Sequence, residues 1–286
     1  MLSPGEVAVT TTVRQAAVAG SWYPGSAVAI TAEVDQYLEA AGEVSAPGRV
    51  IALVSPHAGL RYSGPVAAHG YRLLRGRSPL TVVLVGPSHR AAFGGVAVQA
   101  HGAWETPLGR VPIDEDVAGA LLDAGSGVLE HPDVHRDEHS LEMQMPFLQR
   151  LVSDLRIVPA MMGSQSRHEV DSLAEALAAA LAGREDVIMV ASSDLSHYQP
   201  AAVANRQDAV VVEQVGHLDA AGLMDRLETH ENVACGGGPV VAVMKAARAL
   251  GADQATVLKY ADSGDVGEGD KSHVVGYLSA VLTASS

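Results

Sequence analysis

Two histidines in this sequence directly follow apolar runs, in segments that proline or glycine interrupts. His57 lies in SPHAG (55–59) after the run VIALV, and His89 ends GPSH (86–89) after TVVLV. Such runs are typical of buried β-strands, and the loops after parallel strands meet at one edge of a sheet. We therefore expect His57 and His89 to present imidazole nitrogens to one cation. The alternative for each is a loop histidine hydrogen-bonded to backbone.

The single cysteine, Cys235, stands in ACGGGP (234–239), just before an expected helix over 239–250. Pro239 suits the first turn of that helix. The positive end of a helix dipole lowers the pKa of a nearby thiol, and glycines allow backbone to approach closely. Cys235 is therefore a candidate functional thiolate. The alternative is a glycine-rich turn that contains an incidental small residue.

A carboxylate and an imidazole three residues apart follow another apolar run, VIMVA. Asp194 and His197 lie in SSDLSHY (192–198), so in a turn or the first coil of a helix they can face one site. A carboxylate beside an imidazole fixes its tautomer and improves it as a general base or metal ligand. The alternative is that Asp194 caps a helix and His197 is solvated.

A further histidine, His139, lies in DEHSLEMQ (137–144). Ser140 and Met143 or Gln144 are spaced like an N-cap and the third position of a helix, so the segment mostly predicts a helix start. The alternative is that His139 and Glu142 support the site from behind. The remaining histidines have no comparable setting and are predicted to be structural or exposed; they are His69, His101, His131, His135, His168, His217, His230 and His273.

Strand-like and helix-like segments alternate along the chain. Strands are predicted at 50–54, 81–86, 94–98, 155–159, 187–191 and 274–278, and helices at 28–41, 64–75, 115–124, 141–153, 169–182, 203–217 and 239–250. This alternation predicts an α/β fold with a mostly parallel sheet covered by helices on both faces. Since no repeat or long linker interrupts the pattern, we expect one domain over residues 1–286.

Composition argues against several classes of function. The chain has 286 residues, 48% of them hydrophobic, and a net charge of -14 with no basic run, so nucleic acid is a poor candidate partner. The first fifteen residues lack a secretory signal, and no segment is an apolar twenty-mer, so we expect a cytoplasmic protein without a membrane span. One cysteine agrees with a reducing compartment. The sequence also lacks Walker, GxGxxG, HExxH, GxSxG and paired CxxC motifs.

A set of motifs in a fixed order resembles the Memo family, and it extends across nearly the whole chain. The motifs are GSWYP (20–24), PHAG (56–59), YSG (62–64), GPSH (86–89), TPLG (106–109), EHSLEMQMPFL (138–148), SSDLSHY (192–198), CGGGP (235–239), YADSGDV (260–266) and VVGY (274–277). The resemblance implies a three-layer αβα fold similar to the class III extradiol ring-cleavage dioxygenases. It also implies a metal held by His57, His89 and Cys235, with acid/base roles for Asp194 and His197.

The implied ligand set of two histidines and one cysteine differs from the two-histidine, one-carboxylate set of those dioxygenases. A thiolate is a softer ligand, so Fe(II) or copper is expected and zinc also fits. The first hypothesis is therefore a non-heme iron- or copper-dependent oxidoreductase that acts on a small-molecule substrate. In it, His197 and Asp194 move protons, and His139 is a further candidate.

Two other hypotheses follow from the same resemblance. Animal Memo proteins are implicated in signalling through receptor-derived phosphopeptides, which implies a non-catalytic module that binds a peptide or partner, and Trp22 and Tyr23 could line its pocket. Prokaryotic Memo-like proteins occur alongside a radical S-adenosylmethionine protein and an AMMECR-type protein, which implies those two partners.

Overall fold

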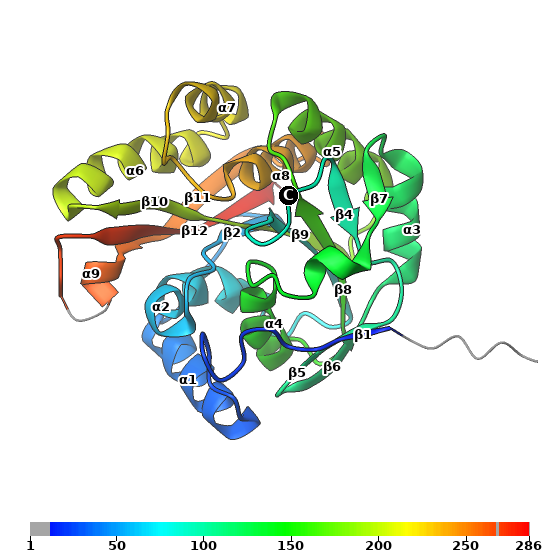
Figure 1. Ribbon diagram of the computed structural model, residues 1–286, viewed down its shortest axis with the longest axis horizontal. Helices are drawn as coiled ribbons and strands as arrows, with labels where there is room; N and C mark the ends of the chain where they lie inside the picture. The colour runs from blue at the N-terminus through cyan, green and yellow to red at the C-terminus, as the bar shows by residue number, and fades with distance from the viewer. Residues whose placement is uncertain (1–11, 267–268, 286) are drawn as a thin grey trace, which may run out of the picture.

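The computed structural model describes residues 12–266 and 269–285, and a single large mixed sheet forms its centre (Figure 1). The strand order is β10-β12-β2-β9-β3-β8-β4-β7, and β11 also pairs with β12. The strands are β2 (Arg49–Ser55), β3 (Leu80–Pro87), β4 (Val96–Val98), β7 (Val128–Glu130), β8 (Leu155–Met162), β9 (Val187–Ser192), β10 (Asp194–Gln199), β11 (Gln254–Asp262) and β12 (Val274–Ala284). The central four, β2, β9, β3 and β8, run parallel, whereas β12 and β4 pair antiparallel with them.

Helices cover both faces of this sheet, which confirms the α/β fold with three layers that the sequence predicts. One face carries α1 (Ala27–Ala40), α2 (Leu60–Tyr71) and α4 (Met145–Leu151). The other carries α3 (Glu115–Ala124), α5 (Arg167–Ala180), α6 (Ala201–Gly216), α7 (Ala220–Thr229) and α8 (Gly237–Ala249). The short helices are α9 (Ser263–Val266), η1 (Arg72–Leu74), η2 (Pro132–His135) and η3 (Glu142–Gln144).

Local sequence explains where several helices begin. Ser26, Asp114 and Ser166 precede α1, α3 and α5, and the side chain of each accepts a hydrogen bond from a backbone N–H in the first turn. Such caps satisfy N–H groups that have no partner inside the helix. The inner strands β3 and β9 are buried along their whole length, as expected for strands covered on both faces.

A second, smaller sheet holds the start of the described chain against the main body. It has the order β1-β5-β6, from β1 (Val13–Arg14), β5 (Ala103–Thr106) and β6 (Gly109–Pro112). Arg14 is buried, donates to the carbonyls of His135 and Glu138, and lies 4.1 Å from the centre of the Trp104 ring. Residues 1–11, which include most of the segment expected to lack a secretory signal, lie outside the described residues.

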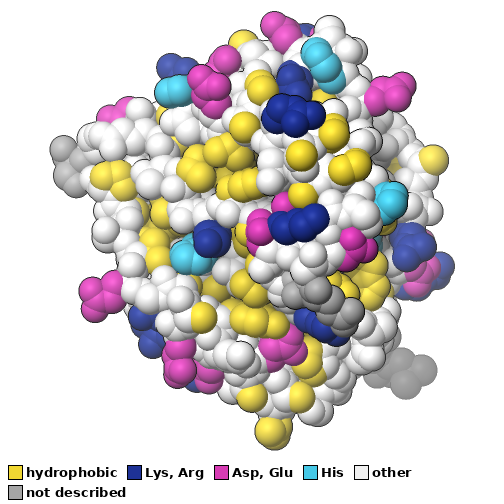
Figure 2. Space-filling model, turned by 90° about the vertical axis from the view of Figure 1, so that its left-hand side faces the viewer, with side chains coloured by type: hydrophobic (Ala, Val, Ile, Leu, Met, Phe, Trp, Pro, Cys, Tyr) yellow, Lys and Arg dark blue, Asp and Glu magenta, His cyan; other side chains and the backbone are white. Residues whose placement is uncertain are grey.

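Several predicted elements differ from the observed ones. The predicted strand 94–98 is only three residues long and joins the sheet antiparallel, and α2 begins at Leu60, four residues before the predicted start. Asp194–Gln199 forms strand β10 on the edge of the sheet, so the predicted turn or helical coil there is wrong. No helix within 12–266 and 269–285 has the length and apolar character to span a bilayer. On the face drawn in Figure 2, acidic and basic side chains are interspersed.

Candidate metal centre

The carboxyl ends of β2, β9 and β3 meet at one edge of the sheet and carry the candidate ligands. β9 lies between the other two strands, and its last residue, Ser192, is in register with Ser55 of β2. His57 therefore extends from one side of β9 and His89 from the other. The ring centroids of the two histidines are 5.2 Å apart. The two residues therefore meet across β9 and do not come from directly adjacent strands.

Hydrogen bonds determine which nitrogen of His57 faces the site. Ser192 Oγ lies 2.8 Å from His57 Nδ1, donates its proton to the carbonyl of Ser140, and accepts from Gln144 Nε2. Because the single hydroxyl proton is used at Ser140, the bond with His57 needs a proton on Nδ1. His57 Nε2 is therefore left with a free lone pair, which is the form that binds a metal.

His89 is oriented in the same way by a carboxylate. Glu138 Oε1 lies 3.0 Å from His89 Nδ1, and Glu138 Oε2 accepts from the backbone N–H of His89. An ionised carboxylate only accepts, so Nδ1 carries a proton and Nε2 is the nitrogen left to bind a metal. Burial pulls the pKa of Glu138 upward, but the hydrogen bonds from His89 and from the Ser140 N–H outweigh it and hold the pKa well below its usual range. Glu138 therefore remains ionised beside His89.

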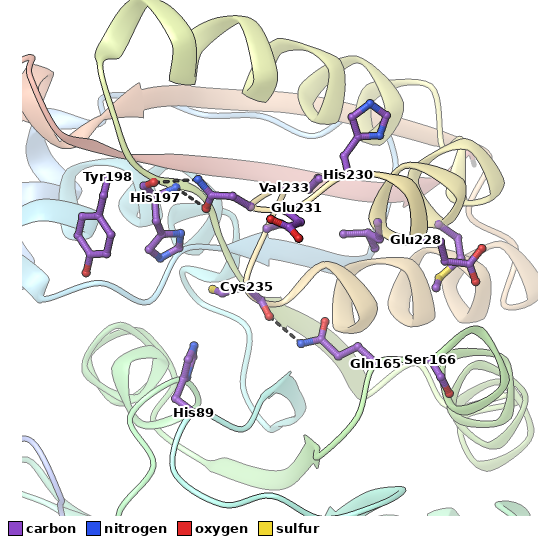
Figure 3. A pocket seen from close by; sticks show the side chains of 14 residues that line it. His89, Gln165, Ser166, His197, Tyr198, Glu228, His230, Glu231, Val233 and Cys235 are labelled. Carbon is purple, nitrogen blue, oxygen red and sulfur yellow. Dashed lines mark hydrogen bonds between the residues drawn. The ribbon is translucent and has the colours of Figure 1, made fainter.

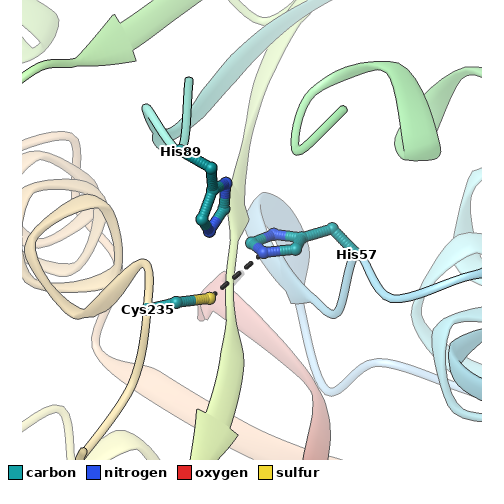
Figure 4. A group of neighbouring side chains, drawn as sticks. All are labelled: His57, His89 and Cys235. Atoms are coloured by element: carbon teal, nitrogen blue, oxygen red, sulfur yellow. Dashed lines mark hydrogen bonds between the residues drawn. The ribbon is translucent and has the colours of Figure 1, made fainter. Parts of the chain in front are cut away.

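Cys235 completes a group of three ligand atoms. One ligand atom each from His57, His89 and Cys235 lies within 4.8 Å of the others, and Cys235 Sγ is 3.1 Å from His57 Nε2 (Figure 4). A thiolate and an imidazole bound to one ion at about 2.3 and 2.0 Å lie roughly 3.0 to 3.5 Å apart, depending on the angle. The observed separation falls in this range. These three residues therefore fit a single metal ion.

The first two glycines after Cys235 pack closely against a backbone carbonyl and a side chain. A Cβ on Gly236 would lie 2.2 Å from the carbonyl oxygen of Ser192, and a Cβ on Gly237 would lie 2.3 Å from the Leu227 side chain. The backbone N–H of Cys235 donates to the Asp194 carbonyl, and that of Gly236 donates to Ser193 Oγ. Residues 234–238, here called the cysteine loop, run from Ala234 into the first turn of α8 and are therefore fixed against the end of β9 and the start of β10.

The fold does not lower the pKa of the Cys235 thiol. Burial, followed by the nearby Asp194 carboxylate, raises the pKa of the Cys235 thiol. This outweighs the lowering expected from the start of α8. The neutral thiol matches the geometry, since S–H can donate to the free lone pair of His57 Nε2. A bound metal would instead bind the thiolate and displace this proton.

Asp194 supports the loop of His57 rather than the ring of His197. Its Oδ1 accepts from the backbone N–H groups of His57 at 2.8 Å and Ala58 at 3.2 Å. The predicted contact in which Asp194 orients His197 is replaced by this one, because β10 is extended there. Burial raises the pKa of Asp194 to about 7, although the two N–H groups oppose the rise. Asp194 also lines the cavity at the site.

The backbone of His197 is held by a neighbouring loop. Asn232 accepts from the His197 N–H at 3.0 Å and donates to the His197 carbonyl at 2.8 Å. Tyr198, the next residue, has a φ of 58°, which is uncommon for a residue other than glycine, and the residue is 72% exposed. Burial lowers the pKa of His197. In Figure 3, His197 and Tyr198 stand on one side of the cavity and His89 on the other.

His139 lies beside the ligands, but its neighbour Glu142 does not. The His139 ring is 4.2 Å from Trp22 and 4.6 Å from His89, and burial lowers its pKa to about 4. Its Nδ1 is 3.1 Å from Glu138 Oε1 without hydrogen-bond geometry, and the two residues with His89 form a second group of candidate ligand atoms. Glu138 Oε1 already accepts from the ring of His89 and from the backbone N–H groups of His139 and Ser140, which leaves little room for a cation.

Glu142 and the start of the described chain support this region from behind. Fully buried Glu142 accepts from Arg14, from the backbone N–H groups of Ala17 and Val18, and from the Tyr23 hydroxyl. Tyr23 is therefore a core residue, whereas Trp22 lines the cavity. Ser140 does not cap a helix as predicted, because its hydroxyl donates to the Pro87 carbonyl.

Two cavities meet at this group of residues. One of about 660 Å³ is lined by His57, Asp194 and His139 and by aromatic side chains, which are Trp22, Tyr62 and Tyr198. The other, of about 680 Å³, lies on the side of Cys235 and is lined by the loop after α7 (Figure 3). That loop includes His230, which the sequence predicts to be structural or exposed. His89, His197 and Tyr198 border both cavities. The candidate centre is therefore accessible from two sides.

Sequence reasoning missed the residues that orient the ligands. Ser192 and Glu138 lie within the motifs, but no spacing rule predicts that they contact His57 and His89, because those contacts join residues 135 and 49 positions apart. Gln144 acts through Ser192, since it donates to the hydroxyl that holds His57. A carboxylate directly before His139 and paired serines at the end of a strand are the only signals that the sequence carried.

Comparison with known proteins identifies the family of this chain. A family model of Memo-like proteins matches residues 14–281. A MEMO1 family protein of Methanothermobacter thermautotrophicus is 38% identical over 275 residues, which cover 93% of this chain and 98% of that protein. MEMO1 family proteins of Methanopyrus kandleri and Thermotoga neapolitana are 36% and 37% identical over 94% and 95% of this chain. Since the similarity extends over nearly the whole length of each protein, this chain belongs to the Memo family.

Proposed function

We propose that this chain is a metal-dependent oxidoreductase whose ion is held by His57, His89 and Cys235. The observation that supports it most is the convergence of one ring nitrogen from each histidine with one sulfur inside 4.8 Å, while Nδ1 of both rings is held by a hydrogen bond. Metal-binding histidines typically have their second nitrogen held in this way. A cluster of side chains without a function would not be expected to have both imidazole rings oriented in this way.

The ligand set favours iron or copper. Two imidazoles suit iron, copper and zinc alike, and the thiolate of Cys235 adds a soft donor that stabilises copper(I) and alters the redox balance of iron. When bound, either ion would supply one-electron redox chemistry. Zinc also binds such ligands but would supply only Lewis acidity.

The residues around the ligands suit the handling of protons. Asp194, with a pKa of about 7, and His197 both line the cavity of about 660 Å³ and are proposed to exchange protons with a substrate there. His139, whose pKa of about 4 keeps it neutral, would accept a hydrogen bond from that substrate. The cavity has the size of a small-molecule site, and its walls are mainly aromatic and imidazole rings.

Oxygen consumption tests this proposal. Protein loaded anaerobically with Fe(II) or Cu(I) is exposed to air with a panel of phenolic and thiol substrates, beside Cys235→Ala and His197→Asn. We expect uptake that is abolished in Cys235→Ala and reduced in His197→Asn at unchanged metal content. Folded, metal-loaded protein that consumes no oxygen and shows no change in its electron paramagnetic resonance signal would refute the oxidoreductase and leave a binding module.

A further inference from the structure

A glutamine outside every motif contacts the cysteine loop from the opposite side. Gln165 lies in the loop between β8 and α5, 70 residues before Cys235 in the sequence. Its Nε2 donates to the Cys235 carbonyl at 2.7 Å, and its Oε1 accepts from the Gly238 N–H at 2.8 Å. Figure 3 shows the first of these bonds. One amide thus bridges two residues of the loop.

The orientation of this amide is fixed by its partners. A backbone carbonyl only accepts and a backbone N–H only donates, so Nε2 must face Cys235 and Oε1 must face Gly238. Gly238 also leaves the space that the glutamine occupies, because a Cβ on it would lie 2.8 Å from the Gln165 Cβ. The loop and the glutamine are therefore packed against each other as well as hydrogen-bonded.

The cysteine loop cannot be held by its own side chains. Three glycines follow Cys235, and α8 begins without a side-chain cap from its own N-cap residue, Gly236. Glycine loses more conformational freedom on folding than any other residue, so this segment needs outside partners to stay in one conformation. Asp194 and Ser193 hold it from the sheet through backbone and hydroxyl contacts. Gln165 supplies the bonds on the other side, in the role of a cap for α8.

We infer that Gln165 is a positioning residue that fixes the sulfur of Cys235 in front of His57 and His89. It contacts the cysteine through the main chain and not through the sulfur, so it acts on where the ligand lies. The consequence for metal binding rests on the function proposed above. The consequence for the thiol itself does not, because the contacts of Gln165 are made between protein atoms alone.

Thiol reactivity tests the inference without a metal. Cys235 is the single cysteine, so the rate of reaction of metal-free protein with a disulfide reagent reports on it alone. We expect Gln165→Ala and Gln165→Met to react roughly tenfold faster than wild type, since each leaves the loop with unsatisfied polar groups and opens it more often. Methionine has nearly the volume of glutamine, so a faster reaction of Gln165→Met cannot come from a wider entrance to the cavity beside Cys235.

The matched control is Gln149→Ala. Gln149 also bridges two chain segments, accepting from Thr106 Oγ1 and donating to the Gly109 carbonyl, but it lies in α4 and lines neither cavity. The Cys235 thiol of this variant should react at the wild-type rate. If Gln165→Met reacts at the wild-type rate, or Gln149→Ala is equally fast, the inference is wrong.

A second readout separates this inference from the metal proposal. Cobalt(II) bound by Cys235 gives a thiolate-to-metal charge-transfer band, which Cys235→Ala removes. We expect the band to weaken in Gln165→Met and cobalt affinity to fall roughly 10- to 100-fold, as for other supports of metal ligands. Faster thiol reaction with no cobalt band in any protein would retain the positioning role and reject the metal site. An unchanged band and affinity in Gln165→Met would reject the positioning of a ligand.

Discussion

Replacing Ser192 by alanine should weaken metal binding through the tautomer of His57. The Ser192 hydroxyl is buried and holds His57 Nδ1 at 2.8 Å, with its own proton donated to Ser140. Alanine removes one oxygen and no other contact atom. The Nδ1–H of His57 is then buried without an acceptor, and the ring can relieve this by moving its proton to Nε2, the atom that should bind the metal.

The size of the effect follows from these contacts. A buried donor left without a partner costs about 1 to 3 kcal/mol, so the free energy of unfolding should fall by that amount. Loss of the group that orients a ligand typically lowers metal affinity roughly 10- to 100-fold. Gln144 Nε2 also loses an acceptor but keeps the Pro56 carbonyl at 3.1 Å, so it adds little.

Urea unfolding and metal titration against a competing chelator measure the two effects. Ser279→Ala is the matched control, because Ser279 is equally buried in the sheet and its Oγ has no hydrogen-bond partner among the described residues. We expect the control to bind metal as tightly as wild type and to be at least as stable, because it loses an unsatisfied buried hydroxyl and no hydrogen bond. A folded Ser192→Ala protein that binds metal as tightly as wild type would refute the argument from the tautomer.

Three further predictions concern the neighbouring contacts. Glu138→Gln keeps the size of the side chain but removes the charge held at His89 Nδ1, so metal affinity should fall roughly 10- to 100-fold in the same titration; an unchanged affinity would contradict this. Gly236→Ala places a Cβ 2.2 Å from the Ser192 carbonyl oxygen and should lower the free energy of unfolding by about 1 to 3 kcal/mol, so wild-type stability in urea would count against the packing described. Burial lowers the pKa of His135 to about 3, so the free energy of unfolding decreases as the pH falls below about 6.5 towards 3, by about 2 kcal/mol at pH 5. The His135→Gln variant should lose less stability than wild type between pH 7 and pH 5 in urea unfolding. An equal loss in both proteins would refute the role of His135.

The fold and the candidate ligands could be predicted because they depend on local patterns. Val- and Ile-rich runs predict buried strands, and residues that follow such strands gather at one edge of the sheet. This reasoning predicted that His57 and His89 lie close together, and the structure confirms this proximity. Cys235 was found because a glycine-rich segment before a helix is a recognisable setting.

The supporting contacts could not be predicted, because they join segments that are far apart in the sequence. The tautomer of His57 depends on Ser192 and Ser140, and the position of Cys235 depends on Gln165. For Asp194 the local spacing misled, since it suggested His197 as a partner. The extended edge strand β10 instead directs the carboxylate to the backbone of His57 and Ala58. Helical spacing fails there because pairing with β12 decides the conformation.

Elemental analysis of anaerobically purified protein tests the metal centre most directly. Wild type is compared with His57→Ala, His89→Ala and Cys235→Ala, each checked for folding by circular dichroism. We expect near-stoichiometric iron or copper in wild type and little or none in the folded variants. Wild-type protein that carries no metal and takes none up on reconstitution, or folded variants that retain it, would contradict the proposed centre.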